Sequence, residues 1–315
     1  AAMGYDGRVR TVRKASYREG CRTTRIINSE GLDRGYKATF LSCSVTAVAE
    51  EGGDAQMGWE MGCGHHITDL DVVQVGESAA KRAVSMLGAR SMSPVRCPLL
   101  IENTVVCELL DVLGASFLVE NVEKGKSMLK GKRGERVAAD SITIRDNGRL
   151  PGGWGSAPFD GEGAPTQTTP LVVEGVCHGY LSDTYWSKRS GEKATGNAVR
   201  STFRNLPRVG TTNLSMEGRG PGVEALMSGM EKGFYVTDLL GVHTINAVTG
   251  EFSLGAAGYR VEGGKISFPV RGMALSGNLL ELLLKIEEVG DDVRYRGSIS
   301  APSIVVSDME VSGAT

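Results

Sequence analysis

The chain has 315 residues, enough for two domains that each bury a core, and carries 35 basic and 37 acidic side chains for a formal net charge of -2. Because nucleic-acid-binding proteins usually carry a basic surplus, this balance argues against nucleic acid as a partner. The apolar stretches are interrupted by charges and fall short of the about 18 residues that a membrane-spanning helix needs, so no membrane partner is expected. The six cysteines are widely scattered, and the N-terminus AAMGYDGRVR lacks a secretory pattern, which predicts reduced thiols and a cytoplasmic location.

The first part of the chain predicts an antiparallel sheet followed by a helix. Polar and β-branched residues alternate in segments 9–17, 23–31 and 38–53, which we expect to be strands. From Thr68 onward apolar residues recur at helical spacing, and Gly88 would end this helix. The segment that follows is typical of a linker. We therefore expect an α+β N-terminal domain over residues 1–92 and a second domain over residues 93–315.

The second domain is predicted to be mostly β, with a few helices. It begins with an apolar strand at 97–102 and a helix around Glu108. Two hairpins are expected, with turns at 174–175 and 263–264. Two further helices are predicted, and an alternating segment near the C-terminus indicates a last strand; the ranges are 222–233, 277–290 and 303–313.

The helix around Glu108, with the sequence VVCELLDVLG, raises the question of catalysis. A zinc peptidase helix needs two histidines that bind one metal, and a glutamate beside the first that polarises the bound water. This helix offers Cys107, Glu108 and Val112 instead. Glu108 also shares a helix stripe with Thr104 and Asp111, so a catalytic acid and a polar edge of a buried helix both stay open as interpretations.

Other candidate sites give weaker signals. Cys63, His65 and His66 place three donors within four residues, but no second ligand cluster follows, which favours an exposed loop over a metal site. His178 and His243 are single histidines in β-rich surroundings, where local hydrogen bonds are the commoner role. The basic run 124–136 lacks interleaved aromatic residues, and no strand leads into the glycine-rich GRGPG at 218–222, so both are expected to be loops.

Four motifs make the chain resemble the TldD/PmbA family, once called modulators of DNA gyrase. They are P-F-D-x-E-G at 158–163, T-G-N at 195–197, N-x-x-T-G-x-F at 246–252 and V-G-x-D at 289–292. The resemblance covers essentially the whole chain, except that the family's first helix and strands have no counterpart. It implies an α+β fold class: a truncated N-terminal α/β-sheet domain, followed by a larger and mostly antiparallel β domain with a few helices.

The resemblance also implies a function. TldD-type chains carry H-E-x-x-x-H and a later cysteine as zinc ligands of a metallopeptidase that acts on unfolded peptides, whereas PmbA-type chains, also called TldE, lack these ligands. In this alignment Cys107 replaces the first histidine, Glu108 keeps the glutamate, Val112 replaces the second histidine, and no cysteine follows Cys177. The resemblance therefore implies a zinc-less PmbA/TldE-type subunit with a vestigial site, no cofactor of its own and a TldD-type partner that binds zinc.

Further expectations follow from this assignment. The candidates for contact with a peptide groove are Thr195, Gly196, Asn197, His243 and Asn246. Without its partner subunit, the chain is expected to form a homodimer. Two alternatives stay open: a stand-alone metal-dependent peptidase that uses Cys107, Glu108 and a histidine, or a peptide-binding module without an enzyme partner.

Overall fold

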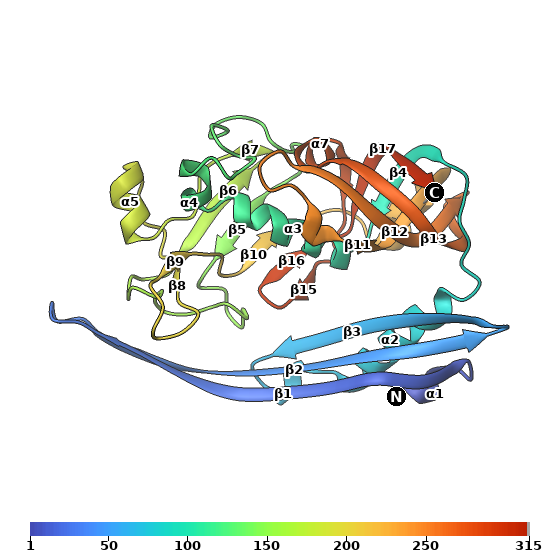
Figure 1. Cartoon of the computed structure of the whole chain (residues 1–315), viewed down its shortest axis with the longest axis horizontal. Helices are drawn as coiled ribbons and strands as arrows, with labels where there is room; N and C mark the ends of the chain where they lie inside the picture. Colours follow the sequence, from blue (N-terminus) through green and yellow to red (C-terminus); the bar gives the residue numbers. More distant parts are fainter. Residues whose placement is uncertain (314–315) are drawn as a thin grey trace.

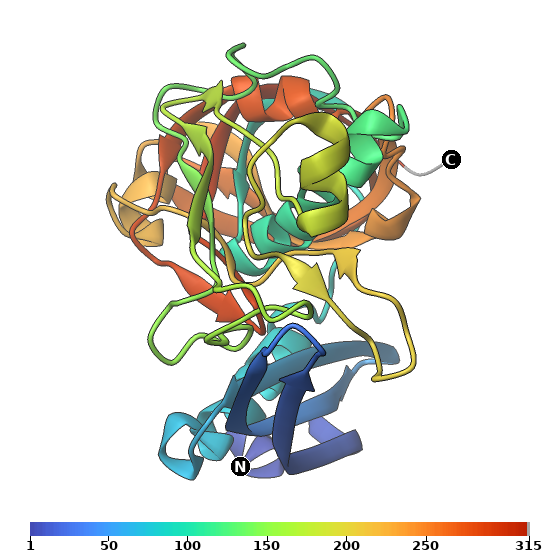
Figure 2. The ribbon, with the colours of Figure 1, turned by 90° about the vertical axis from the view of Figure 1, so that its left-hand side faces the viewer.

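The structure, a computed structural model, describes residues 1–313. A long three-stranded sheet and one helix form a thin layer, and the rest of the chain forms a larger body above it (Figure 1). Seen from the end, the two parts meet along one side of the layer (Figure 2). Elements of both types are present and strands predominate, which confirms the α+β fold class.

The layer consists of three antiparallel strands in the order β1-β2-β3, with α2 packed against β2 and β3. The elements in this part are α1 (Ala2–Tyr5), β1 (Val9–Ile27), β2 (Asp33–Glu51), β3 (Asp54–Gly64), the 3-10 helix η1 (Ile67–Asp69) and α2 (Val72–Ser85). The two short strands predicted at 9–17 and 23–31 are joined into one continuous strand, because β2 pairs with β1 along its whole length, and this strand ends at Ile27 rather than at residue 31.

The sequence analysis missed β3, whose glycines obscure the strand pattern. Gly58 shows why glycine is needed there: a Cβ atom at this position would lie 2.1 Å from the carbonyl oxygen of Ala79 in α2. The start of α2 also differs from the prediction. Asp71 caps the helix by accepting a hydrogen bond from the Gln74 amide at 2.8 Å, and the segment from Thr68 forms part of η1 instead.

The larger body contains two six-stranded sheets, in the orders β15-β16-β10-β5-β6-β7 and β13-β12-β11-β4-β17-β14. An additional pairing of β13 with β17 closes part of the second sheet on itself. The strands of the first sheet are β5 (Ile144–Asn147), β6 (Thr168–Val173), β7 (Val176–Cys177), β10 (Leu214–Met216), β15 (Arg294–Arg296) and β16 (Ile299–Ala301). Those of the second are β4 (Val95–Ile101), β11 (Lys232–Leu240), β12 (Glu251–Glu262), β13 (Lys265–Asn278), β14 (Ile286–Val289) and β17 (Ile304–Gly313).

Short helices and one small hairpin complete this body. They are α3 (Asn103–Ser116), α4 (Val119–Glu123), α5 (Thr184–Ser190), α6 (Val223–Ser228), the 3-10 helix η2 (Val242–Thr244) and α7 (Leu279–Leu284), with the hairpin formed by β8 (Ala198–Val199) and β9 (Arg208–Val209). The predicted hairpin turns at 174–175 and 263–264 are confirmed. The helices predicted at 222–233 and 277–290 end earlier, because the following residues pair as β11 and β14.

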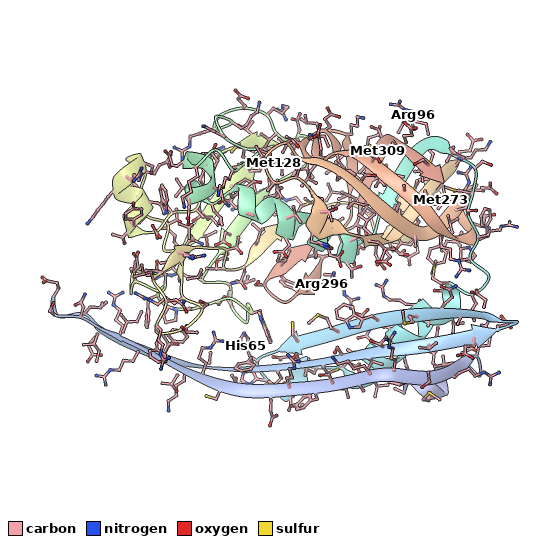
Figure 3. The ribbon with its side chains drawn as sticks, viewed as in Figure 1. His65, Arg96, Met128, Met273, Arg296 and Met309 are labelled. Carbon is pink, nitrogen blue, oxygen red and sulfur yellow. The ribbon has the colours of Figure 1, made fainter. Side chains whose placement is uncertain are left out.

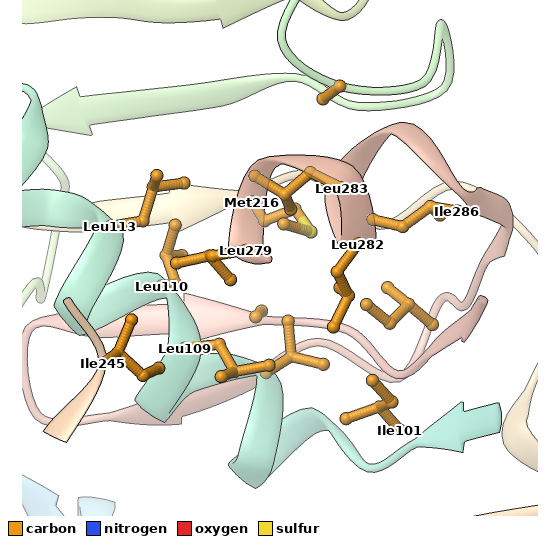
Figure 4. Close-up of a cluster of buried hydrophobic side chains, with 14 of the residues drawn as sticks. Ile101, Leu109, Leu110, Leu113, Met216, Ile245, Leu279, Leu282, Leu283 and Ile286 are labelled. Atoms are coloured by element: carbon orange, nitrogen blue, oxygen red, sulfur yellow. The ribbon is translucent and has the colours of Figure 1, made fainter. Parts of the chain in front are cut away.

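The core of the larger body forms around α3 (Figure 4). Leu109, Leu110 and Leu113 on this helix are buried, and they belong to the same apolar cluster as Leu279 and Leu282 of α7. This packing fixes the rotation of α3 about its axis, so the opposite stripe with Thr104 and Glu108 faces away from the core. In residues 1–313, no helix is both long enough and apolar enough to span a membrane.

Candidate functional site

The candidate site lies where the two parts of the chain meet. We define the domain interface as the region where β3 and α2 face the first half of α3 and the β15–β16 hairpin (Figure 3). Arg296 projects from β15 toward the N-terminal layer, and His65 projects from the end of β3 toward the larger body (Figure 3). Residues that are distant in sequence thus come together around the helix that carries Glu108.

A buried carboxylate organises the charges at this interface. Glu60 on β3 is only 5% exposed, and its carboxylate pairs with Arg294 at 2.7 Å and with Arg82 at 3.5 Å. Arg82 also donates two hydrogen bonds to Glu102, at 2.9 and 3.0 Å. Burial lowers the pKa of Arg82, but the adjacent Glu102 and Glu60 carboxylates outweigh burial and leave it raised. Arg82 is therefore a fixed cation that joins both parts of the chain.

Cys107 is buried and directed at the β15–β16 hairpin. Its Sγ atom lies 3.6 Å from the carbonyl oxygen of Arg294 and 4.0 Å from that of Ile299. Burial raises the pKa of this thiol to about 11. Because only the thiolate is a strong metal ligand or nucleophile, Cys107 is poorly suited to either role at neutral pH.

Glu108 forms an ion pair with Arg296 across the α3–β15 contact. The Arg296 guanidinium also lies over the ring of Trp59, 5.2 Å from its centroid, so it joins Glu108 to β3. Both members of the Glu108–Arg296 pair stay about 30% exposed. Val112, one turn further along α3, packs against the apolar core. The stripe with Glu108 is therefore a polar helix edge whose acid is already paired.

The donors on α3 do not fit a zinc site. A catalytic zinc needs three protein ligands, whereas burial raises the pKa of the Cys107 thiol, Glu108 is paired with Arg296 and Val112 has no donor atom in its side chain. Over the whole described range, residues 1–313, no three histidine, cysteine, aspartate or glutamate side chains converge in a way that could hold a metal.

Cys63 lies near the end of β3, and His65 and His66 form a capped turn directly after this strand, at the domain interface. Asp69 accepts hydrogen bonds from the amides of His65 and His66, both at 2.8 Å. The ring of His65 lies with Nδ1 2.5 Å from the carbonyl oxygen of Thr39 and Nε2 3.2 Å from that of Gly153. Cys63 and His65 are half-buried, so the expected exposed loop is wrong for these two residues.

The T-G-N motif lies inside the larger body. Asn197 is 2% exposed and donates hydrogen bonds to the Asp146 carboxylate at 2.8 Å and the Gly210 carbonyl at 3.0 Å. Thr195 is also buried, where its hydroxyl bonds the backbone of Ser182. Direct contact of these two side chains with a peptide would require their internal hydrogen bonds to break, so their place in a groove stays a prediction.

Gly196 and the two remaining groove candidates differ in their surroundings. Gly196 has a positive φ of 70°, and a Cβ atom there would lie 2.3 Å from the carbonyl oxygen of Pro165. His243 in η2 and Asn246 just after it are exposed. The Asn246 side chain accepts hydrogen bonds from the amides of Val248 and Thr249, at 2.9 and 3.1 Å, which fixes a turn. Only His243 and Asn246 therefore present side chains to solvent.

Two other motifs fix loops rather than forming a reactive site. Asp160 of P-F-D-x-E-G accepts hydrogen bonds from the amides of Glu162, Ala164 and Ala198, at 2.9 to 3.1 Å. Asp292 of V-G-x-D accepts from the Ser303 amide and hydroxyl and from the Asn103 amide group. Asn103 is the first residue of α3, so this motif positions the start of the helix that carries Glu108.

Sequence reasoning did not single out the charged residues of the domain interface. Glu60, Arg82 and Arg294 each lie on a different element, and their partners are far away in the sequence. Trp59, next to Glu60, carries the only sequence signal we can identify: a tryptophan in a glycine-rich stretch that otherwise lacks large aromatic residues.

Comparison with known proteins identifies the family. Residues 94–313 match the family model of the PmbA/TldA metallopeptidase C-terminal domain, and residues 1–87 match that of the central domain. The chain belongs to the PmbA/TldD family. The resemblance drawn from the four motifs is thereby confirmed.

Relatives of this PmbA/TldD-family chain include metalloprotease PmbA of Escherichia coli O157:H7, 30% identical over 314 residues that cover 99% of this chain and 67% of that protein. A crystal structure described as a modulator of a DNA gyrase, from Thermotoga maritima, has a TM-score of 0.93 and 31% identity, covering 99% of this chain and 71% of that one. TldE from Thermococcus kodakarensis shares the fold, with a TM-score of 0.87, 23% identity and coverage of 95% and 69%. The chain spans about two thirds of the length of the curated relatives that it matches.

Proposed function

We propose that this chain is a non-catalytic, PmbA/TldE-like subunit of a cytoplasmic metallopeptidase complex that degrades or processes unfolded peptides. The zinc ion and the working glutamate would belong to a TldD-type partner, and this chain would bind no zinc of its own. In the absence of the partner, the chain would form a homodimer. Residues 1–92 and 93–315 would act as two domains, with the domain interface between them.

The observation that carries this proposal is that the side chains on α3 are unsuited to catalysis. Cys107 is a buried thiol with a pKa raised to about 11, and Glu108 is paired with Arg296. A general base must be within hydrogen-bond reach of a water molecule, and here the Arg296 guanidinium occupies a carboxylate oxygen of Glu108. These features support a vestigial site, and they weigh against a stand-alone peptidase that uses Cys107 as a metal ligand.

The proposed contact with peptide uses backbone as well as side chains. In the described residues β3 pairs only with β2, so its other edge is free, and that strand also carries Trp59 and Glu60 at the domain interface. Extended peptides can bind such edges through main-chain hydrogen bonds. His243 and Asn246 would add side-chain contacts. Thr195, Gly196 and Asn197 would act indirectly, by fixing the loops of the larger body.

Peptide hydrolysis by a reconstituted pair tests the proposal. The chain alone should leave an unstructured peptide intact, and mixing it with a TldD-type subunit should give cleavage that a chelator stops. Glu108→Gln, which keeps a hydrogen-bond acceptor for Arg296, and Glu108→Ala should both leave this cleavage nearly unchanged. As the matched control, replacing the glutamate of H-E-x-x-x-H in the TldD-type subunit should reduce the rate about a thousandfold. A loss of that size from Glu108→Gln would show that Glu108 performs the chemistry.

A further inference from the structure

A second candidate site lies in the larger body, away from the domain interface. It is a cavity of about 850 Å³, within the range of roughly 300–1,000 Å³ that is typical of small-molecule sites. Four segments line it: the loop before β5, the β6–β7 turn, the loop before α6, and β14. Of the single histidines considered above, His178 contributes to its wall, whereas Cys107, Glu108 and Val112 of α3 do not. We call it the Arg145 cavity, after the arginine that lines it from β5.

Both walls of the Arg145 cavity are held by backbone contacts. On one side the carbonyl oxygen of Gly175 accepts hydrogen bonds from the amides of Val137 and Ala138, at 2.8 and 3.1 Å. On the other side Gly220 packs so closely on β14 that a Cβ atom would lie 1.9 Å from the carbonyl oxygen of Val289. The glycines of GRGPG thus serve close packing, as Gly220 shows, and the cavity is formed before any ligand arrives.

Two arginines contribute positive charge to the lining of the cavity. Arg145 and Arg219 both line it, and both pair with the single carboxylate of Glu217. Each guanidinium has five N–H donors, which is more than one shared carboxylate can accept. The side chain of Arg145 is 42% exposed and that of Arg219 is 77% exposed, so donors remain accessible to a ligand. Such a pair is suited to a carboxylate, which guanidinium binds in a planar, two-pronged way.

The lining of the cavity also carries negative charge. Glu174 and Glu288 line it as well, and neither forms an ion pair within residues 1–313. The third acid, Asp140, is already paired with Arg136. Two unpaired carboxylates repel a ligand that is purely anionic and attract an ammonium group. The charges that line the cavity therefore favour a ligand with both a carboxylate and an amine.

We propose that the Arg145 cavity binds a short peptide with free termini, its carboxylate at Arg145 and Arg219 and its amino group at Glu288 and Glu174. The volume suits a peptide of about two to four residues. This inference is independent of the proposed peptidase partnership, since it requires only binding to this chain and no cleavage.

Calorimetric titration of the chain with trialanine tests the proposal. Trialanine should bind saturably, and N-acetyl-trialanine amide, which has neither terminal charge, should bind at least about tenfold more weakly. Arg219→Gln should weaken trialanine binding by a similar factor, and because this side chain is largely exposed, the fold should not depend on it. Arg22→Gln, an exposed arginine on β1, is the matched control and should change nothing.

Four results would overturn the proposal. The first is no saturable binding of trialanine up to about 10 mM. The second is equal binding of trialanine and the doubly blocked peptide, and the third is unchanged trialanine binding in Arg219→Gln. The fourth is equal binding of trialanine and N-acetyl-trialanine, which would remove the role of Glu174 and Glu288. A loss of trialanine binding in Glu288→Gln, with N-acetyl-trialanine unaffected, would support the assigned orientation.

Discussion

Two buried carboxylates show that the two regions of this protein are held in different ways. Glu60, at the domain interface, is 5% exposed and pairs with two arginines, Arg82 from its own layer and Arg294 from the larger body. Asp146, inside the larger body, is completely buried and accepts hydrogen bonds from neutral donors on Thr212 and Asn197. One carboxylate joins two domains through charge, and the other fixes loops within one domain.

This contrast indicates which part of the molecule can change its geometry. Hydrogen bonds from neutral donors to a buried carboxylate have strict distance and angle requirements, so the loops around Asp146 have one well-defined arrangement. Ion pairs that stay partly exposed tolerate small displacements and are weakened by water and salt. We therefore expect the T-G-N region to be rigid and the contact between the two domains to be the more adjustable part.

The largest expected effect is that of Gly196→Ala in the T-G-N motif. The new Cβ atom would lie 2.3 Å from the carbonyl oxygen of Pro165, at a positive φ of 70°. We expect a loss of about 3 kcal/mol in the free energy of unfolding, measured by urea denaturation. Gly191→Ala is the matched control: its φ is 76° but no atom lies within 4 Å, so only backbone strain of about 1 kcal/mol remains. Equal losses in the two variants would mean that the T-G-N region is not tightly packed.

The next effect in size concerns Glu60→Gln, which removes the charge shared by Arg82 and Arg294. Removing one member of a fully buried pair costs about 3–5 kcal/mol, but the two arginine side chains are 27% and 38% exposed. We therefore expect a loss of about 2 kcal/mol, together with faster proteolysis of the connection between the domains. Glu51→Gln, in an exposed pair with Arg8, should cost less than about 0.5 kcal/mol. If the two variants behaved alike, the charges at the domain interface would not hold the domains together.

The smallest effect is a change in pH dependence at Asp146. Burial raises the pKa of this carboxyl, against the opposing effect of hydrogen bonds from Thr212 and Asn197. Because the pKa of this carboxyl is higher in the folded state than in the unfolded state, the protonated carboxyl stabilises the folded state fully at pH values below the unfolded-state pKa. This contribution is lost as the pH rises through the folded-state pKa. Relative to Asp146→Asn, the wild-type chain should therefore lose stability as the pH rises above about 4, the ordinary pKa of an aspartate in an unfolded chain. A difference between the two proteins that stayed constant or changed in the opposite direction would contradict the raised pKa.

Much of the fold could be predicted from the sequence, where local backbone requirements decide the structure. The turns at 174–175 and 263–264 were found because glycine adopts positive φ, 77° at Gly175 and 56° at Gly263. The helix around Glu108 was found because its apolar residues recur on one face. The four motifs sufficed to identify the family, and Asp160 and Asp292 show why they are informative: each fixes a loop through several hydrogen bonds.

Strands that form because they pair with a neighbouring element could not be predicted from the local sequence pattern. Nothing in the local pattern of β3 marks it as a strand; it is one because β2 pairs with it and because Gly58 admits the backbone of α2. In the same way α6 and α7 end before their apolar patterns do, since the residues that follow form β11 and β14 in the second sheet. Propensity is a weak preference, and pairing with a buried neighbour overrides it.

At the candidate site, too, some features could be predicted from the sequence and others depend on the tertiary structure. The amino-acid sequence was sufficient to predict that Cys107, Glu108 and Val112 share one helix and that Val112 has no donor atom in its side chain. The tertiary structure decided that Arg296 pairs with Glu108, that the Cys107 thiol faces backbone carbonyls, and that Glu60 joins the two domains. Charges interact through space, with no dependence on separation along the chain. Which arginine meets which carboxylate is therefore set only when the sheets and α3 have brought them within reach.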